Sequence, residues 1–280
     1  MNATQLIPPR DLEAIQSVWR VDLEGRKARY GYYYLPDNYS EVILVLKGDL
    51  QRFVIGTRQR TRMEQHKCYL APARSKGTIL YANDDVSLLI FKVRPNLHNA
   101  IIHNKCFESR NDIKELDLSA YASPSWERAL RVQDSDYLMK GLYSYLEDRY
   151  QFSRGAESVI EQCMEIIAEH HGHIKVKDLN DLVGVCKSTL EEKFNKELGL
   201  SPKEFCKIEK INYFLSNHQS FQGEMTLTQL TFKSGYYDQS HLIKEFRYFV
   251  DLSPRKYLKE INKLDLRVRS EASPVMAMAG

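Results

Sequence analysis

The chain has 280 residues, of which 43% are apolar and 28% charged, a composition typical of a globular protein with two domains rather than of a disordered or fibrous one. It contains no run of 18 apolar residues and no basic-then-apolar N-terminus, so neither a transmembrane helix nor a signal peptide is predicted. The net charge of +3 does not by itself indicate a nucleic-acid partner, and the five widely spaced cysteines are typical of reduced thiols in a cytoplasmic protein.

Residues 1 to about 120 alternate between short runs rich in Val, Ile, Tyr and Phe and short clusters of turn-forming residues. Short strands at regular spacing predict a β-sandwich or a β-barrel. The predicted strands are Tyr30–Pro36, Ser40–Gly48, Gln51–Thr57, Lys67–Pro72, Gly77–Asn83 and Val86–Pro95.

Two kinds of ligand site can be considered in this domain. A metal site is not predicted, because His66, His98 and His103 form no closely spaced pair. Aromatic side chains either line an apolar ligand cavity or only fill the interior. These candidates for effector binding are Tyr32, Tyr34, Phe53, Tyr69, Tyr81 and Phe91.

Several arginines in the same domain could pair with an acidic effector. The run Arg58-Gln59-Arg60-Thr61-Arg62 is, however, also typical of a solvated hairpin. The other two candidates are Arg52 and Arg74.

Apolar residues recur at helical spacing from Pro124 to Tyr150, which predicts a pair of helices. A linker follows, and another helix starts at Ser158. The segment His170-His171-Gly172-His173 ends that helix. Its position favours a helix C-terminus stabilised by the helix dipole over a metal site.

A sixteen-residue pattern occurs twice, as LEEKFNKELGLSPKEF at Leu190–Phe205 and as LIKEFRYFVDLSPRKY at Leu242–Tyr257. At an offset of 52 residues, Leu aligns with Leu, Phe with Phe and Leu-Ser-Pro with Leu-Ser-Pro. A repeat of this kind indicates a duplicated supersecondary unit.

The second copy predicts two short helices joined by a tight turn. Thr226 is the expected N-cap of a helix over Leu227–Ser234, and Gly235 ends that helix. Asp238 is the expected N-cap of the next helix, Gln239–Phe249. This arrangement is a helix-turn-helix unit.

The first copy has the same outline. Its helices are Val176–Val183 and Lys187–Glu197, with Gly184 in the turn, and the helix Pro202–Ser216 joins the two units. Cys186 occupies the N-cap position of the second helix, where it is weaker than Ser or Asp by about 1 kcal/mol.

Two helix-turn-helix units joined by one helix resemble the DNA-binding domain of the AraC/XylS family of transcriptional regulators. The resemblance covers about Ser158 to Lys259. The N-terminal strands resemble, by position and strand pattern, the cupin-like sensor half of many members. The residues that carry the resemblance are Gly235-Tyr236, Leu242, Phe246, Leu252-Ser253-Pro254 and Tyr257.

This resemblance implies a two-domain α+β fold, with an N-terminal cupin-like β-barrel and helices followed by an all-α domain with two helix-turn-helix units. Residues 1–151 form the sensor and dimerisation domain. The helices at 124–150 carry the dimer contact, pack on the barrel, or do both. Residues 152–157 are the linker, 158–262 the DNA-binding domain, and 267–280 a disordered tail. The implied partners are double-stranded DNA at a promoter or operator, RNA polymerase, a small-molecule effector and a second copy of the chain.

In the family, the second helix of each module enters the major groove of DNA. Gln can bind adenine, Lys and His can bind guanine, and Glu can accept a hydrogen bond from cytosine but repels phosphate. The candidates for base contact are Gln239, Ser240, His241 and Lys244 in the second module and Lys187, Ser188, Glu191 and Glu192 in the first. Lys203, Arg255 and Lys256 are the candidates for phosphate contact.

The charges favour the second module as the stronger DNA contact. The stretch 157–200 has five Lys and Arg residues against nine Asp and Glu, and the stretch 201–260 has nine against seven. Phosphate binding needs local positive charge on one face, so the first module either reads cytosine or mainly positions its partner.

The sequence thus predicts a sequence-specific, effector-controlled transcription regulator and no enzyme. It has no clustered His and Glu ligands, no Gly-rich phosphate loop and no nucleophile elbow, so no catalytic residue, metal or cofactor is predicted. Two alternatives remain open: a cupin-type enzyme fused to a DNA-binding module, and a DNA-binding regulator without an effector.

Overall fold

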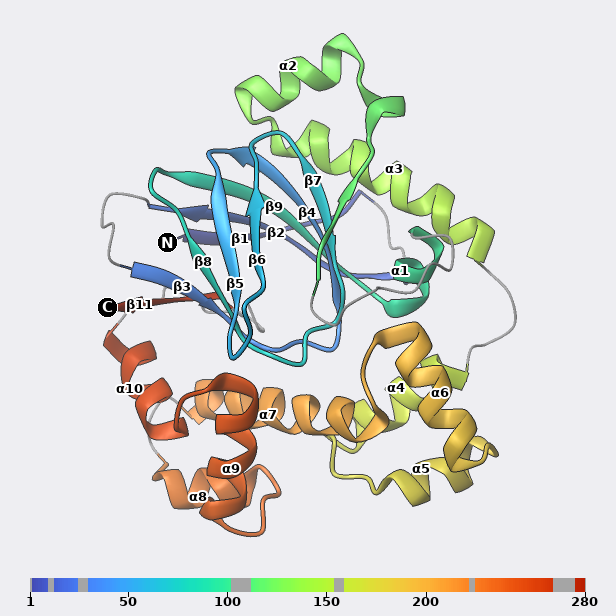
Figure 1. The fold of residues 1–280 in the computed structure, drawn as a ribbon, viewed down its shortest axis with the longest axis vertical. Helices are drawn as coiled ribbons and strands as arrows, with labels where there is room; N and C mark the ends of the chain where they lie inside the picture. The colour runs from blue at the N-terminus through green and yellow to red at the C-terminus, as the bar shows by residue number, and fades with distance from the viewer. Residues whose placement is uncertain are drawn as a thin grey trace.

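The computed structural model describes residues 2–9, 13–24, 30–101, 112–153, 159–221, 225–263 and 275–279. An N-terminal domain of two antiparallel sheets lies on a layer of C-terminal helices (Figure 1). The predicted fold class, an antiparallel β domain followed by an all-α domain with two helix-turn-helix units, is confirmed.

Both sheets are built from short strands whose described pairings are antiparallel. The first sheet has the order β1 (Asn2–Leu6), β2 (Ile15–Leu23), β9 (Val86–Val93), β4 (Ser40–Lys47), β7 (Cys68–Ala71) and β10 (Lys114–Leu116). The second has the order β11 (Val275–Ala279), β3 (Tyr30–Tyr34), β8 (Thr78–Tyr81), β5 (Leu50–Val54) and β6 (Arg60–Met63).

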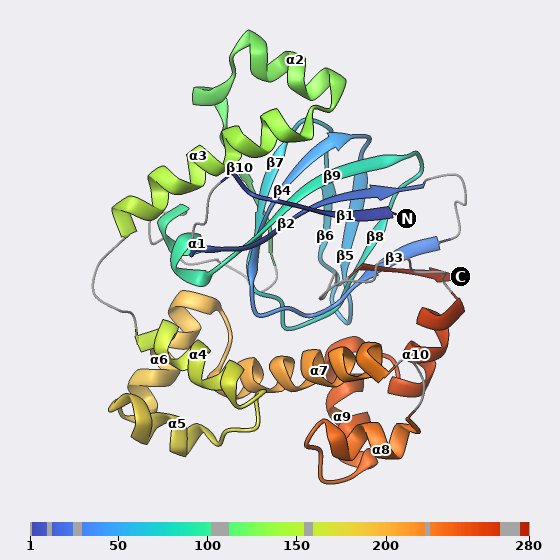
Figure 2. The same ribbon diagram turned by 180° about the vertical axis from the view of Figure 1, so that it is seen from behind.

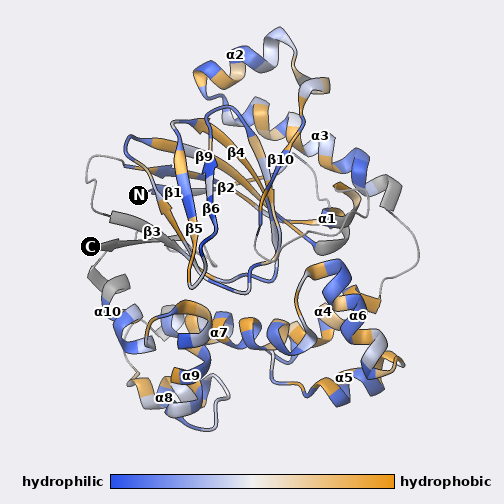
Figure 3. Ribbon diagram, viewed as in Figure 1, coloured by the Kyte–Doolittle hydropathy of each residue, from blue (hydrophilic) through white to orange (hydrophobic). Residues whose placement is uncertain are grey.

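The first sheet is the central layer of the N-terminal domain. Successive side chains of a strand point to opposite faces. Val42 and Leu44 of β4 share a core with Leu142 of α3, whereas Ile43 and Val45 share a core with the second sheet. Because both faces of β4 and β9 are covered, these strands are apolar almost throughout (Figure 3).

Helices cover the outer face of the first sheet. α3 (Ser135–Ser153) runs along it beside α2 (Pro124–Val132), as the view from behind shows (Figure 2). α1 (Pro95–Ile101) follows β9, and the 3-10 helix η1 is Ser119–Tyr121. The predicted helical pair at 124–150 is therefore present, packed on the sheet.

Both helix-turn-helix modules share one hydrophobic core. Leu190 and Phe194 of the first module and Leu242 and Phe246 of the second are fully buried in the same cluster, together with Phe214 of the joining helix. The helices are α4 (Val159–Glu169), α5 (Val176–Val183), α6 (Lys187–Leu198), α7 (Pro202–Phe221), α8 (Leu227–Lys233), α9 (Gln239–Val250) and α10 (Pro254–Lys263).

Two expected boundaries need correction. α3 continues to Ser153, into the predicted linker 152–157, because no Gly or Pro follows Tyr150 before Gly155; residues 154–158 lie outside the described ones. The segment Val275–Ala279 of the expected disordered tail forms β11 along the edge of β3. Its sequence VMAMA is apolar and can add a strand to an open sheet edge.

Candidate nucleic-acid interface

The second module holds its helices by the predicted caps. Thr226 and Gln229 form a reciprocal capping box at the start of α8. Asp238 Oδ1 accepts a hydrogen bond from the backbone N–H of His241 at 2.7 Å, which caps α9. Gly235 between them has φ of 76°, a left-handed conformation that favours glycine. The turn is thus fixed by local chemistry, and it sets the angle at which α9 leaves α8.

α9 divides into a buried and an exposed face. Leu242, Phe246 and Phe249 are fully buried against the joining helix and the rest of the core. The opposite face exposes Ser240 and Lys244. This spacing is the one predicted for a recognition helix, and it leaves both polar side chains accessible to a major groove.

Gln239 and His241 are positioned more tightly than the sequence implies. Gln239 Nε2 donates a hydrogen bond to Thr228 Oγ1 at 2.5 Å, which orients its amide. His241 Nε2 lies 3.3 Å from Glu245 Oε1, which also binds Lys207 Nζ at 3.3 Å. His241 is therefore drawn toward α7, and Ser240 and Lys244 are the freer candidates for base contact.

A charged groove of about 470 Å³ lies beside this face of α9, between it and α7. Positive side chains predominate in it, so it suits the phosphate oxygens of a nucleic-acid backbone. Its lining residues are Lys207, His241, Lys244, Glu245, Arg247 and Tyr248.

The first module has the same scaffold with a different surface. Gly184 has φ of 69°, and Asn180 Nδ2 donates to the carbonyl of Val185 at 3.0 Å to hold the turn. Cys186 occupies the N-cap position of α6 without a side-chain capping hydrogen bond to the backbone. The expectation of a weaker cap agrees with this geometry.

The exposed face of α6 is acidic at its centre. Lys187, Ser188, Glu191 and Glu192 are all exposed, as expected of a surface helix face. Lys187 Nζ lies 3.9 Å from Glu191 Oε1, so the one lysine at its start is partly neutralised. This face carries less positive charge than that of α9.

The candidates for phosphate contact lie at helix starts. Lys203 stands in the first turn of α7, and Arg255 and Lys256 stand in the first turn of α10; all three are exposed. Backbone N–H groups at a helix N-terminus favour an anion, which adds to the attraction of these side chains.

Sequence reasoning missed two exposed residues of the second module. Tyr237 directly precedes the N-cap of α9 and is 86% exposed. Arg247 lies on the exposed face of α9, one turn after Lys244. The helical period from Ser240 and Lys244 could have found Arg247, whereas the exposure of Tyr237 follows from the turn geometry.

The histidine segment after α4 joins the two modules. His173 Nε2 lies 2.7 Å from the carbonyl oxygen of Ser234 in the second module, and His171 stacks on Tyr213 with centroids 3.9 Å apart. Burial lowers the pKa of His173. Within the described ranges, no group of three or more His, Cys, Asp or Glu side chains is placed to hold a metal ion.

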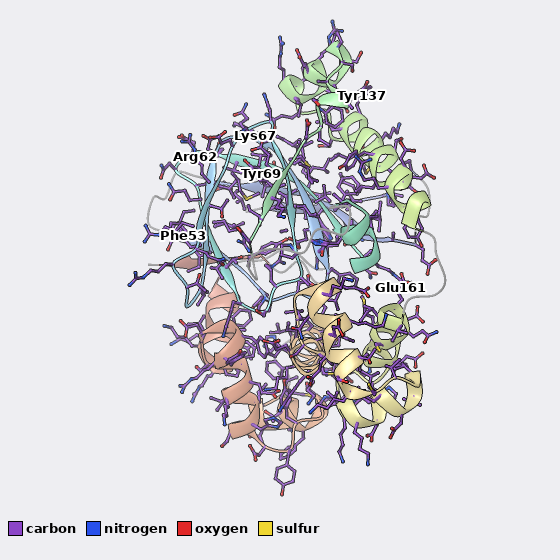
Figure 4. All side chains as sticks on the ribbon, turned by 45° about the vertical axis from the view of Figure 1, so that its right-hand side comes forward. Phe53, Arg62, Lys67, Tyr69, Tyr137 and Glu161 are labelled. Atoms are coloured by element: carbon purple, nitrogen blue, oxygen red, sulfur yellow. The ribbon has the colours of Figure 1, made fainter. Side chains whose placement is uncertain are left out.

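The aromatic candidates for effector binding do not meet in one cavity. Tyr34 and Tyr69 are buried between the sheets, and the Tyr34 hydroxyl donates to Glu41 Oε1 at 2.7 Å. Phe53 and Tyr81 lie on the outer face of the second sheet (Figure 4 labels Phe53). Of the two remaining aromatic residues, Phe91 faces the helices of the N-terminal domain and Tyr32 lies in β3.

The arginine candidates also separate. Arg74 is buried and binds Glu41 with two hydrogen bonds of 2.7 and 3.1 Å. Its guanidinium is therefore used inside the domain and does not face a ligand. Arg52 is buried beside it, and burial lowers its pKa to about 10. Arg60 and Arg62 are exposed in β6, where the sequence suggested a solvated hairpin.

The N-terminal domain contacts both ends of the helical domain. Arg94 lies 3.7 Å from Glu165 of α4, and α1 lies against α6. Asn38 Nδ2 donates to the carbonyl of Phe205 and to Glu209, at 3.2 and 3.1 Å, on α7. The N-terminal domain therefore holds the helical domain through contacts to α4, α6 and α7.

The end of α9 receives its own contact from the N-terminal domain. Lys76 Nζ donates to the carbonyl of Tyr248 at 2.5 Å and lies 3.5 Å from the centre of its ring. The N–H of Gly77 donates to the carbonyl of Phe249 at 2.9 Å. These are the last carbonyls of the recognition helix, which lack intrahelical partners.

Comparison with known proteins agrees with this geometry. A family model described as a helix-turn-helix domain matches residues 179–260. No curated protein sequence matches the chain. No described helix is long and apolar enough to span a membrane.

The match and the fold confirm the resemblance to AraC/XylS-family regulators: the chain carries a DNA-binding helix-turn-helix domain of the AraC type. The fold across both domains is similar to that of ToxT from Vibrio cholerae, of which several structures match. The O395 structure is 12% identical with a TM-score of 0.52, covering 89% of this chain and 98% of ToxT. A second crystal form of ToxT is 10% identical with a TM-score of 0.55, and the match covers 88% of this chain and 98% of ToxT. A structure with bound unsaturated fatty acid is 13% identical with a TM-score of 0.52, covering 89% and 96%.

Proposed function

We propose that this protein is a sequence-specific DNA-binding transcription regulator that reads its operator mainly through α9 and is controlled by a small-molecule effector. The observation that carries the proposal is the pair of helix-turn-helix modules in one core, each with an exposed polar face on its second helix. A rigid pair of recognition helices is suited to two major-groove segments of one duplex.

The chemistry of the two faces assigns them different tasks. Lys244 can donate to the guanine acceptors O6 and N7, and the amide of Gln239 can pair with adenine. Arg247 and Lys207 in the adjacent groove can neutralise phosphates. The acidic face of α6 suits only a cytosine amino group, so the first module mainly fixes the position of the second.

Effector control is supported by the contacts between the domains. The sensor domain holds both α7 and α9, so a change in its shape reaches the DNA-binding helices directly. Two ToxT structures contain a bound unsaturated fatty acid and a bound naphthyl butenoic acid. By analogy, this protein responds to a small organic molecule.

The remaining partners are those that the resemblance to the AraC/XylS family implies. A second copy of the chain would dock through the helical pair α2 and α3, where Val132 and Tyr137 are exposed. A dimer doubles the number of phosphate contacts, which compensates for the modest positive charge of each DNA-binding domain. RNA polymerase is the expected partner at the promoter.

Selection of bound sites from random DNA by the full-length protein tests the proposal. We expect enrichment of a defined sequence, and loss of specific positions when Lys244→Ala is used in the same selection. Lys47→Ala, an exposed lysine on β4 away from the DNA-binding helices and the helical pair, is the matched control and leaves the selected sequence unchanged. Recovery of random sequence by the unmodified protein would refute sequence-specific binding.

A further inference from the structure

The outer face of the second sheet carries a groove of about 1010 Å³. Strands β5, β6 and β8 form its floor. In β5, Gln51 and Phe53 point outward, whereas Leu50 and Val54 are buried between the sheets. The groove is thus separate from the interior where an effector cavity was expected. The side chains that line it between the strands are Gln51, Phe53, Arg60, Arg62, Ile79 and Tyr81.

The strand register gives the groove two different ends. Phe53 pairs with Arg60 on one side and with Ile79 on the other, so these three residues form the end nearest the helical domain. The opposite end, near the turns, carries Asp49 and Asp84. An anion is therefore favoured only at the end that holds Arg60.

Arg60 is the cation available to a ligand in this groove. Its guanidinium carbon lies 5.1 Å from the centre of the Phe53 ring, and its side chain is exposed. Among the residues that the structure describes, Arg60 forms no ion pair, whereas Arg62 binds Asp49 at 2.7 Å and lies 3.8 Å from Glu64. A guanidinium over a ring leaves its N–H groups unused by the ring contact, so they can bind a carboxylate with two hydrogen bonds.

Two aromatic rings form the apolar part of the groove. The rings of Phe53 and Tyr81 lie edge to face, with centroids 5.1 Å apart and an angle of 87° between their planes. A planar ring can stack on one of them and meet the edge of the other. The side-chain amides of Gln51, Gln65 and Asn83 provide further hydrogen-bond partners along the groove.

We propose that this groove binds a small organic monoanion with a planar ring and one carboxylate, the carboxylate on Arg60 and the ring against Phe53 and Tyr81. The acidic end of the groove disfavours a second negative charge. As the site of the effector, this assignment rests on the regulatory function proposed above, and it names the chemical class of that effector.

Strand β8 joins the groove to the recognition helix. Ile79 on the groove floor packs against the helical core, and β8 follows directly after Lys76 and Gly77, which bind the carbonyls at the end of α9. Figure 1 shows β5, β6 and β8 ending above α9. A ring bound against Phe53 therefore lies beside β8, and a shift of β8 would move Lys76 and Gly77, which hold the end of α9.

The test of the site is fluorine NMR of 4-fluorobenzoate with the full-length protein. We expect line broadening that reports binding, and weaker binding by about ten- to hundredfold in Arg60→Gln, the range for loss of a hydrogen bond to a charged group. Phe53→Ala lowers the affinity as well. Arg58→Gln, in the same hairpin but outside the groove, is the matched control and binds normally.

Two results would overturn the site. One is equal binding of 4-fluorobenzamide, which has the ring without the charge, and the other is unchanged binding in both Arg60→Gln and Phe53→Ala. The regulatory role is measured separately, as operator affinity with and without 4-fluorobenzoate. Unchanged operator affinity at saturation removes the effector role and leaves the site, whereas failure to bind any operator refutes the proposed function alone.

Discussion

The two helix-turn-helix modules have the same interior and different surfaces. At the 52-residue offset, Leu190 matches Leu242 and Phe194 matches Phe246, and all four are fully buried. Packing density allows little change at such positions, because each buried ring must fill the same space in both copies. The repeat in the sequence therefore reflects the matching buried residues of the two modules.

At the exposed positions the copies have diverged. Glu192 of α6 stands where Lys244 stands in α9, and Asn195 stands where Arg247 does. Cys186 takes the capping position of Asp238. Exposed positions are free to change without loss of the fold, so one scaffold offers DNA an acidic face on one module and a basic face on the other.

The largest effect is expected in the shared core. Phe194→Ala and Phe246→Ala should each lower the free energy of unfolding by about 3–5 kcal/mol, because each leaves a ring-sized cavity. Phe246 packs against Phe214 and Tyr257, with ring centroids 6.0 and 5.3 Å away, and Phe194 packs against Phe205 at 5.8 Å.

Urea denaturation of the full chain measures both variants. Phe232→Ala removes the same ring from a 58% exposed position and should change stability by no more than about 0.5 kcal/mol. A negligible change in only one of the core variants would show that the two cores are not equivalent.

The next effect concerns the reading faces. Lys244→Ala should weaken specific operator binding by about 1–3 kcal/mol without unfolding the protein, since it removes one base contact. Gln239→Ala should act similarly, whereas Glu192→Lys at the matching position of α6 should strengthen binding to any DNA. Gel-shift titrations on operator and random DNA separate the two effects. Operator affinity unchanged from that of the unmodified protein in both Lys244→Ala and Gln239→Ala would remove α9 from the interface.

The two turn glycines should differ in their tolerance of a side chain. Both have left-handed φ values, so either change to Ala costs about 1–2 kcal/mol of stability. At Gly235 an added Cβ would lie 2.6 Å from His173 Nε2, whereas at Gly184 no atom lies within 4 Å. Thermal unfolding should therefore show a larger loss for Gly235→Ala than for Gly184→Ala. The reverse order would contradict the contact between His173 and the turn.

The sequence predicted the helical domain almost residue by residue because its signals are local. Caps such as Thr226 and Asp238, the glycine of each turn and the apolar stripe of each helix all act within a few residues. Strand β4 was equally clear, since its apolar run lies between turn-forming segments.

The parts that could not be predicted depend on contacts between distant segments. β6 reads as a charged hairpin, because Arg60 and Arg62 face solvent and only Met63 is buried. β11 pairs with β3 across most of the chain. Nor does composition distinguish Tyr34 in the interior from Tyr81 on the outer face. The face that a tyrosine takes depends on how its strand is oriented in the sheet. The charged groove beside α9 could not be predicted either, because one of its lysines, Lys207, comes from α7.

The caps offer a finer test of the comparison. Asp238→Ala should lower stability by about 0.5–2 kcal/mol, because the N–H of His241 loses its acceptor. Cys186→Ala should cost less stability than Asp238→Ala, since the side chain of Cys186 forms no capping hydrogen bond of the kind that Asp238 forms. Cys186→Asp should then stabilise the first module. Chemical denaturation of the three variants decides this, and a large loss in Cys186→Ala would contradict the weak cap.

The smallest effect on the fold is expected from the Cys186 thiol itself. Its Sγ lies 3.2 Å from Ser188 Oγ and 3.0 Å from Thr189 Oγ1, and these hydrogen bonds lower the pKa of the thiol to about 7. Burial instead raises the pKa of Cys163 to about 12 and that of Cys206 to about 11. Because the thiolate is the reactive form, iodoacetamide should modify Cys186 at a rate that rises with pH through about 7, while the two buried thiols remain unmodified. Peptide mass spectrometry follows each site, and Ser188→Ala should move the midpoint of the Cys186 profile to higher pH. An unchanged profile in Ser188→Ala would show that the hydroxyl of Ser188 does not stabilise the thiolate.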